Sequence, residues 1–170
     1  GLTLNLFLGW SVSGSIRWSS ARLYELSEVP AERTVKIVVF SGNPERPNSP
    51  SDCIQFYLEK IREIPPVDLI CLPETINVTR VPIPQQELAE PIPGPTSLTL
   101  AEEAKERGCY IAAGMLEREE EGIFNTGVVI DRKGGILGKY RKTHLPPGEG
   151  VLGVMTPGES YPVFEADFGK

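Results

Sequence analysis

Apolar residues in this chain are gathered into short runs that are separated by polar stretches containing proline and glycine. A near-continuous apolar run of about six residues is typical of a strand that is buried on both faces of a sheet. Residues 35–40 and 67–72 have this character. Three further runs, at residues 110–116, 124–130 and 136–140, also have strand composition. The pattern therefore predicts five strands after residue 34.

Between the first three of these runs, the apolar spacing changes to that of amphipathic helices. Residues 49–52 read Ser-Pro-Ser-Asp, which combines a capping serine, an early proline and an acidic residue at a helix start. The apolar residues that follow at i, i+3, i+4 and i+7 are Ile54, Tyr57, Leu58 and Ile61. Two prolines, at 65 and 66, end this helix near residue 64. A second helix contains Leu98, Ala101 and Ala104 and ends at Gly108.

The order of elements is then strand, helix, strand, helix and three strands. This order indicates an α/β fold in which helices pack on at least one face of a sheet. A proline-rich loop is expected at residues 75–95, a charged turn at 117–121 and a glycine-containing turn at 131–135.

Residues 1–29 differ from the rest, because their apolar and polar residues alternate as in β-strands. Residues 14–18 and 21–26 resemble the closing strands of jelly-roll carbohydrate-binding-like modules. Since two or three strands are not a stable module alone, we expect the tail of an upstream β-rich module at 1–29 and a linker at 30–34. The chain opens on Gly1 and closes after a turn, so we expect a piece of a longer protein; a processed chain is the alternative.

Composition excludes several classes of protein. The 170 residues carry 17 Lys and Arg against 23 Asp and Glu, a net charge of −6. An acidic chain without a basic cluster is not expected to bind nucleic acid, and no apolar run approaches the ~20 residues that span a membrane. Three cysteines do not form a disulfide framework. One histidine without a Cys-x-x-Cys pair disfavours a structural zinc site.

Three places in the domain that begins at residue 35 carry candidate chemistry. Glu74 follows a predicted strand, where α/β proteins gather ligands, and its carboxylate could transfer protons; the alternative is a solvated residue at a strand end. Residues 138–145 hold three cations and the only histidine, and could bind an anion or an oxyanion, or form a basic surface turn. His144 is interpreted as a hydrogen-bonded structural residue. Glu149 lies in a loop that could reach back over a site.

Taken in order, residues 68–74 (Asp-Leu-Ile-Cys-Leu-Pro-Glu), 125–126 (Asn-Thr) and 138–145 (Gly-Lys-Tyr-Arg-Lys-Thr-His-Leu) resemble the nitrilase superfamily of carbon–nitrogen hydrolases. The resemblance covers about residues 35–170, as the N-terminal part of such a domain. It implies half of an α-β-β-α sandwich and a Glu-Lys-Cys triad. Glu74 would be the general base, Lys142 the cation beside the oxyanion, and Glu149 an additional glutamate near the substrate.

The resemblance also implies a small-molecule amide or N-carbamoyl substrate, a thioester intermediate, no metal or organic cofactor, and possible homo-oligomers. In the family the nucleophilic cysteine follows the strand entered at residues 168–170. None of Cys53, Cys71 and Cys109 fits that position. We therefore predict that the 170-residue chain alone is inactive.

Two other functions stay open. A glycosidase would use Glu74 and Glu149 as a carboxylate pair roughly 5 to 9.5 Å apart, and a Lys142 ammonium between them would count against it. A binding or scaffold protein would retain the fold without the chemistry. The substrate, and whether the protein is cytoplasmic or exported, are not determined by the sequence.

Overall fold

The chain divides into two units, residues 1–32 and residues 33–170. The computed structural model describes residues 33–150 and 153–170. The strands expected within residues 1–29 lie outside the described residues. None of the helices in the described part of the chain is long and apolar enough to cross a membrane.

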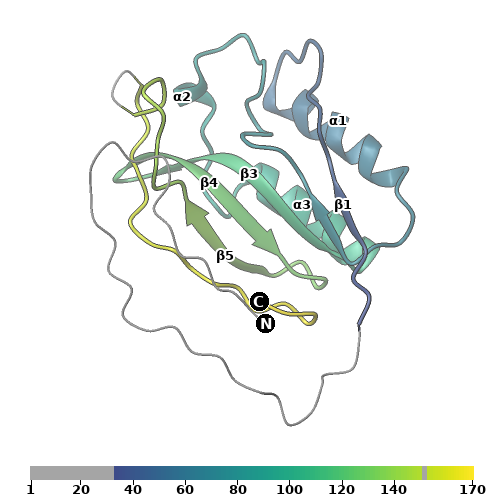
Figure 1. The fold of residues 1–170 in the computed structure, drawn as a ribbon. Coiled ribbons are helices and arrows are strands. Elements are labelled where there is room, and N and C mark those ends of the chain that lie inside the picture. The colour runs from purple at the N-terminus through teal and green to yellow at the C-terminus, as the bar shows by residue number, and fades with distance from the viewer. Residues whose placement is uncertain (1–32, 151–152) are drawn as a thin grey trace, which may run out of the picture. The chain divides into compact units, whose positions relative to one another are not determined.

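The described residues form a mixed α/β unit with the expected order of strands and long helices (Figure 1). The elements are β1 (Ile37–Val39), α1 (Pro50–Arg62), β2 (Leu69–Cys71), α2 (Gln85–Leu88), α3 (Pro95–Arg107), β3 (Tyr110–Glu119), β4 (Gly122–Ile130) and β5 (Ile136–Arg141). The short helix α2 lies in the proline-rich stretch that was expected to be a loop. It has no side-chain cap and no buried residue, which explains why no amphipathic pattern marks it.

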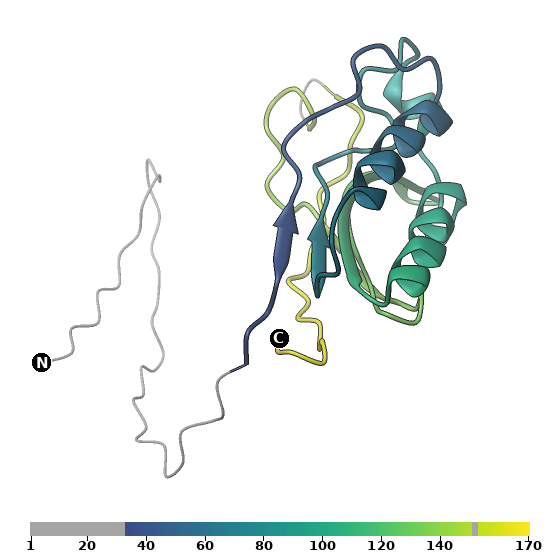
Figure 2. The same ribbon diagram turned by 90° about the vertical axis from the view of Figure 1, so that its right-hand side faces the viewer.

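The five strands form one sheet in the order β1-β2-β3-β4-β5. The pairs β1–β2 and β2–β3 are parallel, whereas β3–β4 and β4–β5 are antiparallel. Right-handed crossovers between neighbouring parallel strands place their helices on the same face. Figures 1 and 2 show α1 and α3 on one side of the sheet. The face without these helices is called the open face below.

The helix ends follow the local signals in the sequence. At the start of α1, the Ser49 hydroxyl accepts a hydrogen bond from the Asp52 backbone N–H at 3.2 Å. The helix ends at Arg62, two residues before the expected end. Helix α3 ends at Arg107 and is capped by Gly108, whose left-handed backbone (φ 63°) is readily adopted by glycine. The predicted apolar face of α1 packs into the main core. In α3, Ala101 and Ala104 do so as expected, but Leu98 is 55% exposed and the core leucine is Leu100.

That core lies between the helices and the sheet. Its larger fully buried members come from α1, α3, the three central strands and the turn after β2: Tyr57, Ile61, Ile70, Ile76, Leu100, Ile111, Met115, Val128 and Ile130. Burying such side chains contributes ~1.5–3 kcal/mol each, and this packing holds the strand ends that carry the polar residues.

Two further expectations about burial are wrong. Strand β1 is not buried on both faces, because Ile37 is 54% exposed and Val39 is 72% exposed. Their side chains lie on the open face, which the described residues leave uncovered at this edge. The charged stretch 117–121 is also not a simple turn: Glu117 is fully buried within β3, and only residues 120 and 121 form the turn. Four of these five residues are glutamates, and their composition alone does not show that one of them faces inward.

Candidate active site

Glu74 stands just beyond the end of β2, where a sharp turn takes the chain across β3. The Leu72 N–H still continues the ladder by donating to Ala112 O at 2.8 Å. Thr75, the residue after Glu74, has a positive φ of 51°. A non-glycine residue in this region costs about 1–3 kcal/mol and is often found at functional sites. The turn therefore aims Glu74 in a direction that an extended strand would not.

Gly114, in β3, allows this turn to lie against the sheet. Its N–H donates to Pro73 O at 3.0 Å, and its carbonyl accepts from the Ile76 N–H at 2.9 Å. A Cβ at position 114 would stand 2.7 Å from Glu74 Cα and 2.9 Å from Pro73 O. Only a residue without a side chain lets the two backbones approach this closely.

Lys142 and Asn125 reach the same place from the neighbouring strands. Lys142 follows β5, and its N–H donates to Asn125 O at 2.8 Å, which extends the β4–β5 pairing. The Lys142 ammonium donates to Glu74 Oε1 at 2.8 Å. The Asn125 amide donates to the same oxygen at 2.7 Å. Asn125 was part of the sequence motif but had no assigned role. The signal that could have identified it as a site residue is the polar pair Asn125–Thr126 within a mainly apolar strand.

Glu149 returns to this cluster from the loop after β5. Its carboxylate accepts hydrogen bonds from the Lys142 ammonium at 3.1 Å and from the Asn125 amide at 3.3 Å. One ammonium and one amide thus bridge two carboxylates. The three candidate residues named from the sequence, Glu74, Lys142 and Glu149, lie together in the fold.

The charges in the cluster shift its ionisation. The pKa of Glu74 lies below its ordinary value, chiefly because Lys142 and then Asn125 donate hydrogen bonds to it. The pKa of Lys142 is raised, first by its hydrogen bond to Glu74 and also by that to Glu149, although burial opposes the shift. At neutral pH, Glu74 is therefore a carboxylate and Lys142 an ammonium ion.

An open cavity of about 370 Å³ adjoins these groups. It is lined by Leu72, Pro73, Glu74, Gly114, Asn125, Gly127, Tyr140 and Lys142. The Glu74 side chain is 56% exposed, so a small molecule can reach its carboxylate from solvent. An ionised carboxylate beside an ammonium can accept a proton while the cation stabilises developing negative charge.

The other two cations of residues 138–145, called the basic block here, do not line this cavity. Lys139 and Arg141 alternate with Tyr140 and Lys142 along β5, so they lie on the opposite face. There they form ion pairs with Glu117 and Glu119. Of the three cations in residues 138–145, only Lys142 therefore lines the cavity, where it could stabilise an oxyanion. His144 Nδ1 lies 2.9 Å from the Thr143 hydroxyl oxygen, in keeping with a structural hydrogen bond.

All three cysteines lie in the described part of the chain, and none of them lines the cavity. Burial raises the pKa of the Cys53 thiol to about 11, and the pKa values of Cys71 and Cys109 are raised for the same first reason. A thiol of raised pKa in apolar surroundings is a poor nucleophile. These cysteines are core and near-core residues.

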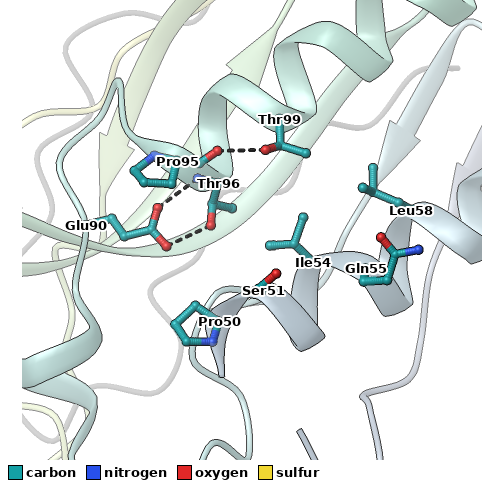
Figure 3. Close-up of a pocket in the computed structure, with 9 residues that line it drawn as sticks. All are labelled: Pro50, Ser51, Ile54, Gln55, Leu58, Glu90, Pro95, Thr96 and Thr99. Carbon is teal, nitrogen blue, oxygen red and sulfur yellow. Dashed lines mark hydrogen bonds between the residues drawn. The ribbon is translucent and has the colours of Figure 1, made fainter. Parts of the chain in front are cut away.

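A second cavity, of about 230 Å³, lies between the starts of α1 and α3 (Figure 3). Its one carboxylate, Glu90, accepts hydrogen bonds from the N–H and the hydroxyl of Thr96, both at 2.8 Å. A carboxylate in this position stabilises the start of α3. Because both its oxygens are occupied in this way, Glu90 is assigned a structural role.

Among the described residues, no group of three or more His, Cys, Asp or Glu side chains is arranged to hold a metal ion.

The family model for carbon–nitrogen hydrolases matches residues 48–170, which include the whole cluster described above. The chain belongs to the carbon–nitrogen hydrolase family. Among curated members, it is 34% identical over 110 residues to the omega-amidase NIT2 of Xenopus tropicalis, covering 60% of this chain and 40% of that protein. It is 38% identical over 91 residues to the beta-ureidopropionase of Arabidopsis thaliana, covering 49% of this chain and 22% of that protein.

Solved structures of the family share the fold. XC1258 from Xanthomonas campestris, a CN-hydrolase superfamily protein, matches with a TM-score of 0.68 and 24% identity, covering 78% of this chain and 49% of that chain. The carbon-nitrogen hydrolase of Helicobacter pylori G27 matches with a TM-score of 0.59 and 23% identity, covering 74% and 45%. This carbon–nitrogen hydrolase chain thus spans less than half the length of each of these relatives.

Proposed function

We propose that the full-length protein hydrolyses a non-peptide carbon–nitrogen bond in a small amide or N-carbamoyl amine. The observation that carries the proposal is the Glu74–Lys142 contact at 2.8 Å beside a solvent-accessible cavity. Family membership supports carbon–nitrogen chemistry, and the similarity to an omega-amidase and a beta-ureidopropionase supports the two substrate classes.

In the proposed reaction, Glu74 removes the proton from a cysteine thiol, and the thiolate attacks the carbonyl carbon. Lys142 stabilises the oxygen that becomes negative in the tetrahedral intermediate. Glu74 then returns the proton to the leaving nitrogen as the carbon–nitrogen bond breaks, which leaves a thioester. Water, deprotonated by Glu74, attacks the thioester, and the carbonyl product and the thiol are released.

Glu149 has a supporting role in this proposal. It shares the Lys142 ammonium with Glu74, so its negative charge offsets part of the cation's pull on the Glu74 carboxylate. Glu74 therefore retains basicity while remaining ionised. Glu149 also borders the site from the loop side, where it can contact the substrate.

We place the nucleophilic thiol outside residues 1–170, because the three cysteines of the chain lie away from the cavity. The 170-residue chain alone is then inactive. The full-length protein is proposed to form homo-oligomers, which light scattering can measure.

A glycosidase is disfavoured by the same geometry. Lys142 lies within 3.1 Å of both Glu74 and Glu149, and it lowers the pKa of Glu74 rather than raising it. A glycosidase acid needs a raised pKa so that it carries a proton at working pH.

The test uses the full-length protein with ω-amide and N-carbamoyl amine substrates, and measures ammonia or amine release. Glu74→Gln is expected to reduce kcat by about 10²-fold or more, because no base remains to activate the thiol. Glu90→Gln, which changes a carboxylate in the other cavity, is expected to leave kcat within about threefold.

A variant with Cys53, Cys71 and Cys109 all changed to Ala is expected to retain activity. Iodoacetamide is expected to abolish this activity, and hydroxylamine to release the acyl group of the thioester as a hydroxamate. Loss of activity in this variant, with the fold intact by circular dichroism, would contradict the placement of the thiol. Full activity in Glu74→Gln would contradict the role of the base. Full-length protein without hydrolysis of either class would favour the scaffold alternative.

A further inference from the structure

Glu117 is a fully buried carboxylate that the proposed reaction does not use. It lies in β3 on the helix-covered face of the sheet, opposite to the candidate site. The Thr126 hydroxyl donates to Glu117 Oε2 at 2.7 Å. Arg141 donates to both carboxylate oxygens, at 2.9 and 3.2 Å, and Lys139 donates to Oε1. One side chain in β3 thus binds residues of both β4 and β5.

Two of these partners are sequence neighbours of site residues. Thr126 follows Asn125, and Arg141 precedes Lys142. Because side chains alternate between the faces of a strand, Glu117 holds Thr126 and Arg141 on one face while Asn125 and Lys142 face the cavity on the other. Thr126 and Arg141 are also direct partners in the β4–β5 pairing.

The β4–β5 pairing contains one irregularity in its register. The register shifts between Val129 and Ile130, at the far end of the hairpin from the site. A slip of one residue would turn every side chain of β5 to the other face. The Lys142 ammonium would then point away from Glu74. Backbone hydrogen bonds are available to every register, whereas the forked Arg141–Glu117 contact is made in only one of them.

Stability alone does not explain why a charged group is buried here. Replacing a buried ion pair by apolar residues is often neutral or stabilising, and such pairs are best attested as devices that specify register. The ring of Phe124, the β4 residue paired with Glu117, lies 3.7 Å from the Arg141 guanidinium carbon and further restricts its position. Both contacts define where Arg141, and therefore the next residue, must lie.

We propose that Glu117 is a positioning residue of the active site, which sets the placement of Asn125 and Lys142 from the opposite face of the sheet. The expected effect on kcat rests on the proposed function, but the expected effect on the placement of Asn125 and Lys142 does not. The placement itself can be measured on the 170-residue chain, through the contact of Lys142 and Asn125 with Glu74.

Glu119 provides a matched control. It also pairs with Lys139 and Arg141, but its side chain is 33% exposed and it makes no hydrogen bond to Thr126. Glu117→Gln and Glu119→Gln remove the same charge from the same cluster. Only the first loosens the link between β4 and β5.

The first experiment is a carbon-13 NMR titration of the Glu74 carboxyl in the 170-residue chain. In Glu117→Gln, the pKa of Glu74 is expected to rise toward its ordinary value of 4.5, because the ammonium and amide donors move away. In Glu119→Gln it is expected to stay at the wild-type value. A folded Glu117→Gln chain with an unchanged Glu74 pKa overturns the proposal.

If Glu117→Gln does not fold, the same titration of Thr126→Val decides the question. This variant removes the link to β4 and keeps every charge of the cluster. A raised Glu74 pKa supports the positioning role, and an unchanged value overturns it.

The second experiment measures the kinetics of the full-length protein. Glu117→Gln is expected to lower kcat about 10- to 100-fold with KM changed less than threefold, as for a misplaced catalytic group. Glu119→Gln is expected to retain kcat within threefold. Equal kcat values for the two variants overturn the kinetic part of the proposal. A wild-type protein without activity refutes the proposed function. The NMR titration of Glu74 then still tests whether Glu117 positions Asn125 and Lys142.

Discussion

The close approach of Gly114 to the Glu74 turn gives a prediction whose size follows from the structure. In Gly114→Ala, the new Cβ would stand 2.7 Å from Glu74 Cα. Since non-bonded carbons stay about 3.5 Å apart, the turn must retreat by about 0.8 Å. The 2.8 Å contact between the Lys142 ammonium and Glu74 would lengthen to about 3.6 Å, beyond hydrogen-bond range.

Three results are expected of Gly114→Ala. The free energy of unfolding of the 170-residue chain falls by ~1–3 kcal/mol in urea titrations, as for other overpacked sites. The pKa of Glu74 rises toward 4.5, because the Lys142 ammonium, whose hydrogen bond lowers it most, is then farther away. In the full-length protein, kcat falls about 10- to 100-fold, since a displacement near 1 Å is costly for catalysis.

Gly127→Ala is the control for the first two measurements. It adds the same methyl group on the same face, but its nearest neighbour outside the adjacent residues is Tyr140 O at 3.9 Å, an ordinary contact. The reasoning is refuted if Gly114→Ala unfolds with the wild-type free energy, within about 0.5 kcal/mol, and leaves the Glu74 pKa unchanged.

Three further predictions concern other parts of the molecule. Lys142→Met is expected to raise the pKa of Glu74 toward 4.5 in an NMR titration and to lower kcat of the full-length protein about 10²- to 10³-fold; an unchanged pKa would show that the contact is not formed in solution. The pKa of Glu119 is lowered from 4.5 to about 2, first by its hydrogen bond with Lys139, so its stabilising contribution is present above pH 4.5 and is lost as the pH falls toward 2. Glu119→Gln should therefore flatten the dependence of unfolding free energy on pH in that window, and parallel curves for the two proteins would refute this. Leu100→Ala, in the core, should cost ~2–5 kcal/mol in urea unfolding, whereas Leu98→Ala, at a position that is 55% exposed, should cost less than about 0.5 kcal/mol; equal losses would mean that α3 does not pack as described.

The order of strands and long helices could be predicted from the sequence, because it depends on local signals. Periodic apolar residues, the Ser49 cap and the Gly108 terminus each act within a few residues of their own position. The burial of β1 could not be predicted in this way. An apolar run has the same sequence pattern whether one or both faces of the strand are buried. Burial depends on which elements pack against the strand.

The sequence by itself determined which residue types carry the candidate chemistry: Glu74 after a strand, Lys142 in a basic block and Glu149 in a loop, together with their resemblance to a known family. Only the tertiary structure decided that one cation of that block faces the cavity and that Glu117 is buried among three partners. Such facts depend on strand register and on the close approach of backbones at Gly114. Both arise from contacts between residues far apart in the chain, which a local pattern does not encode.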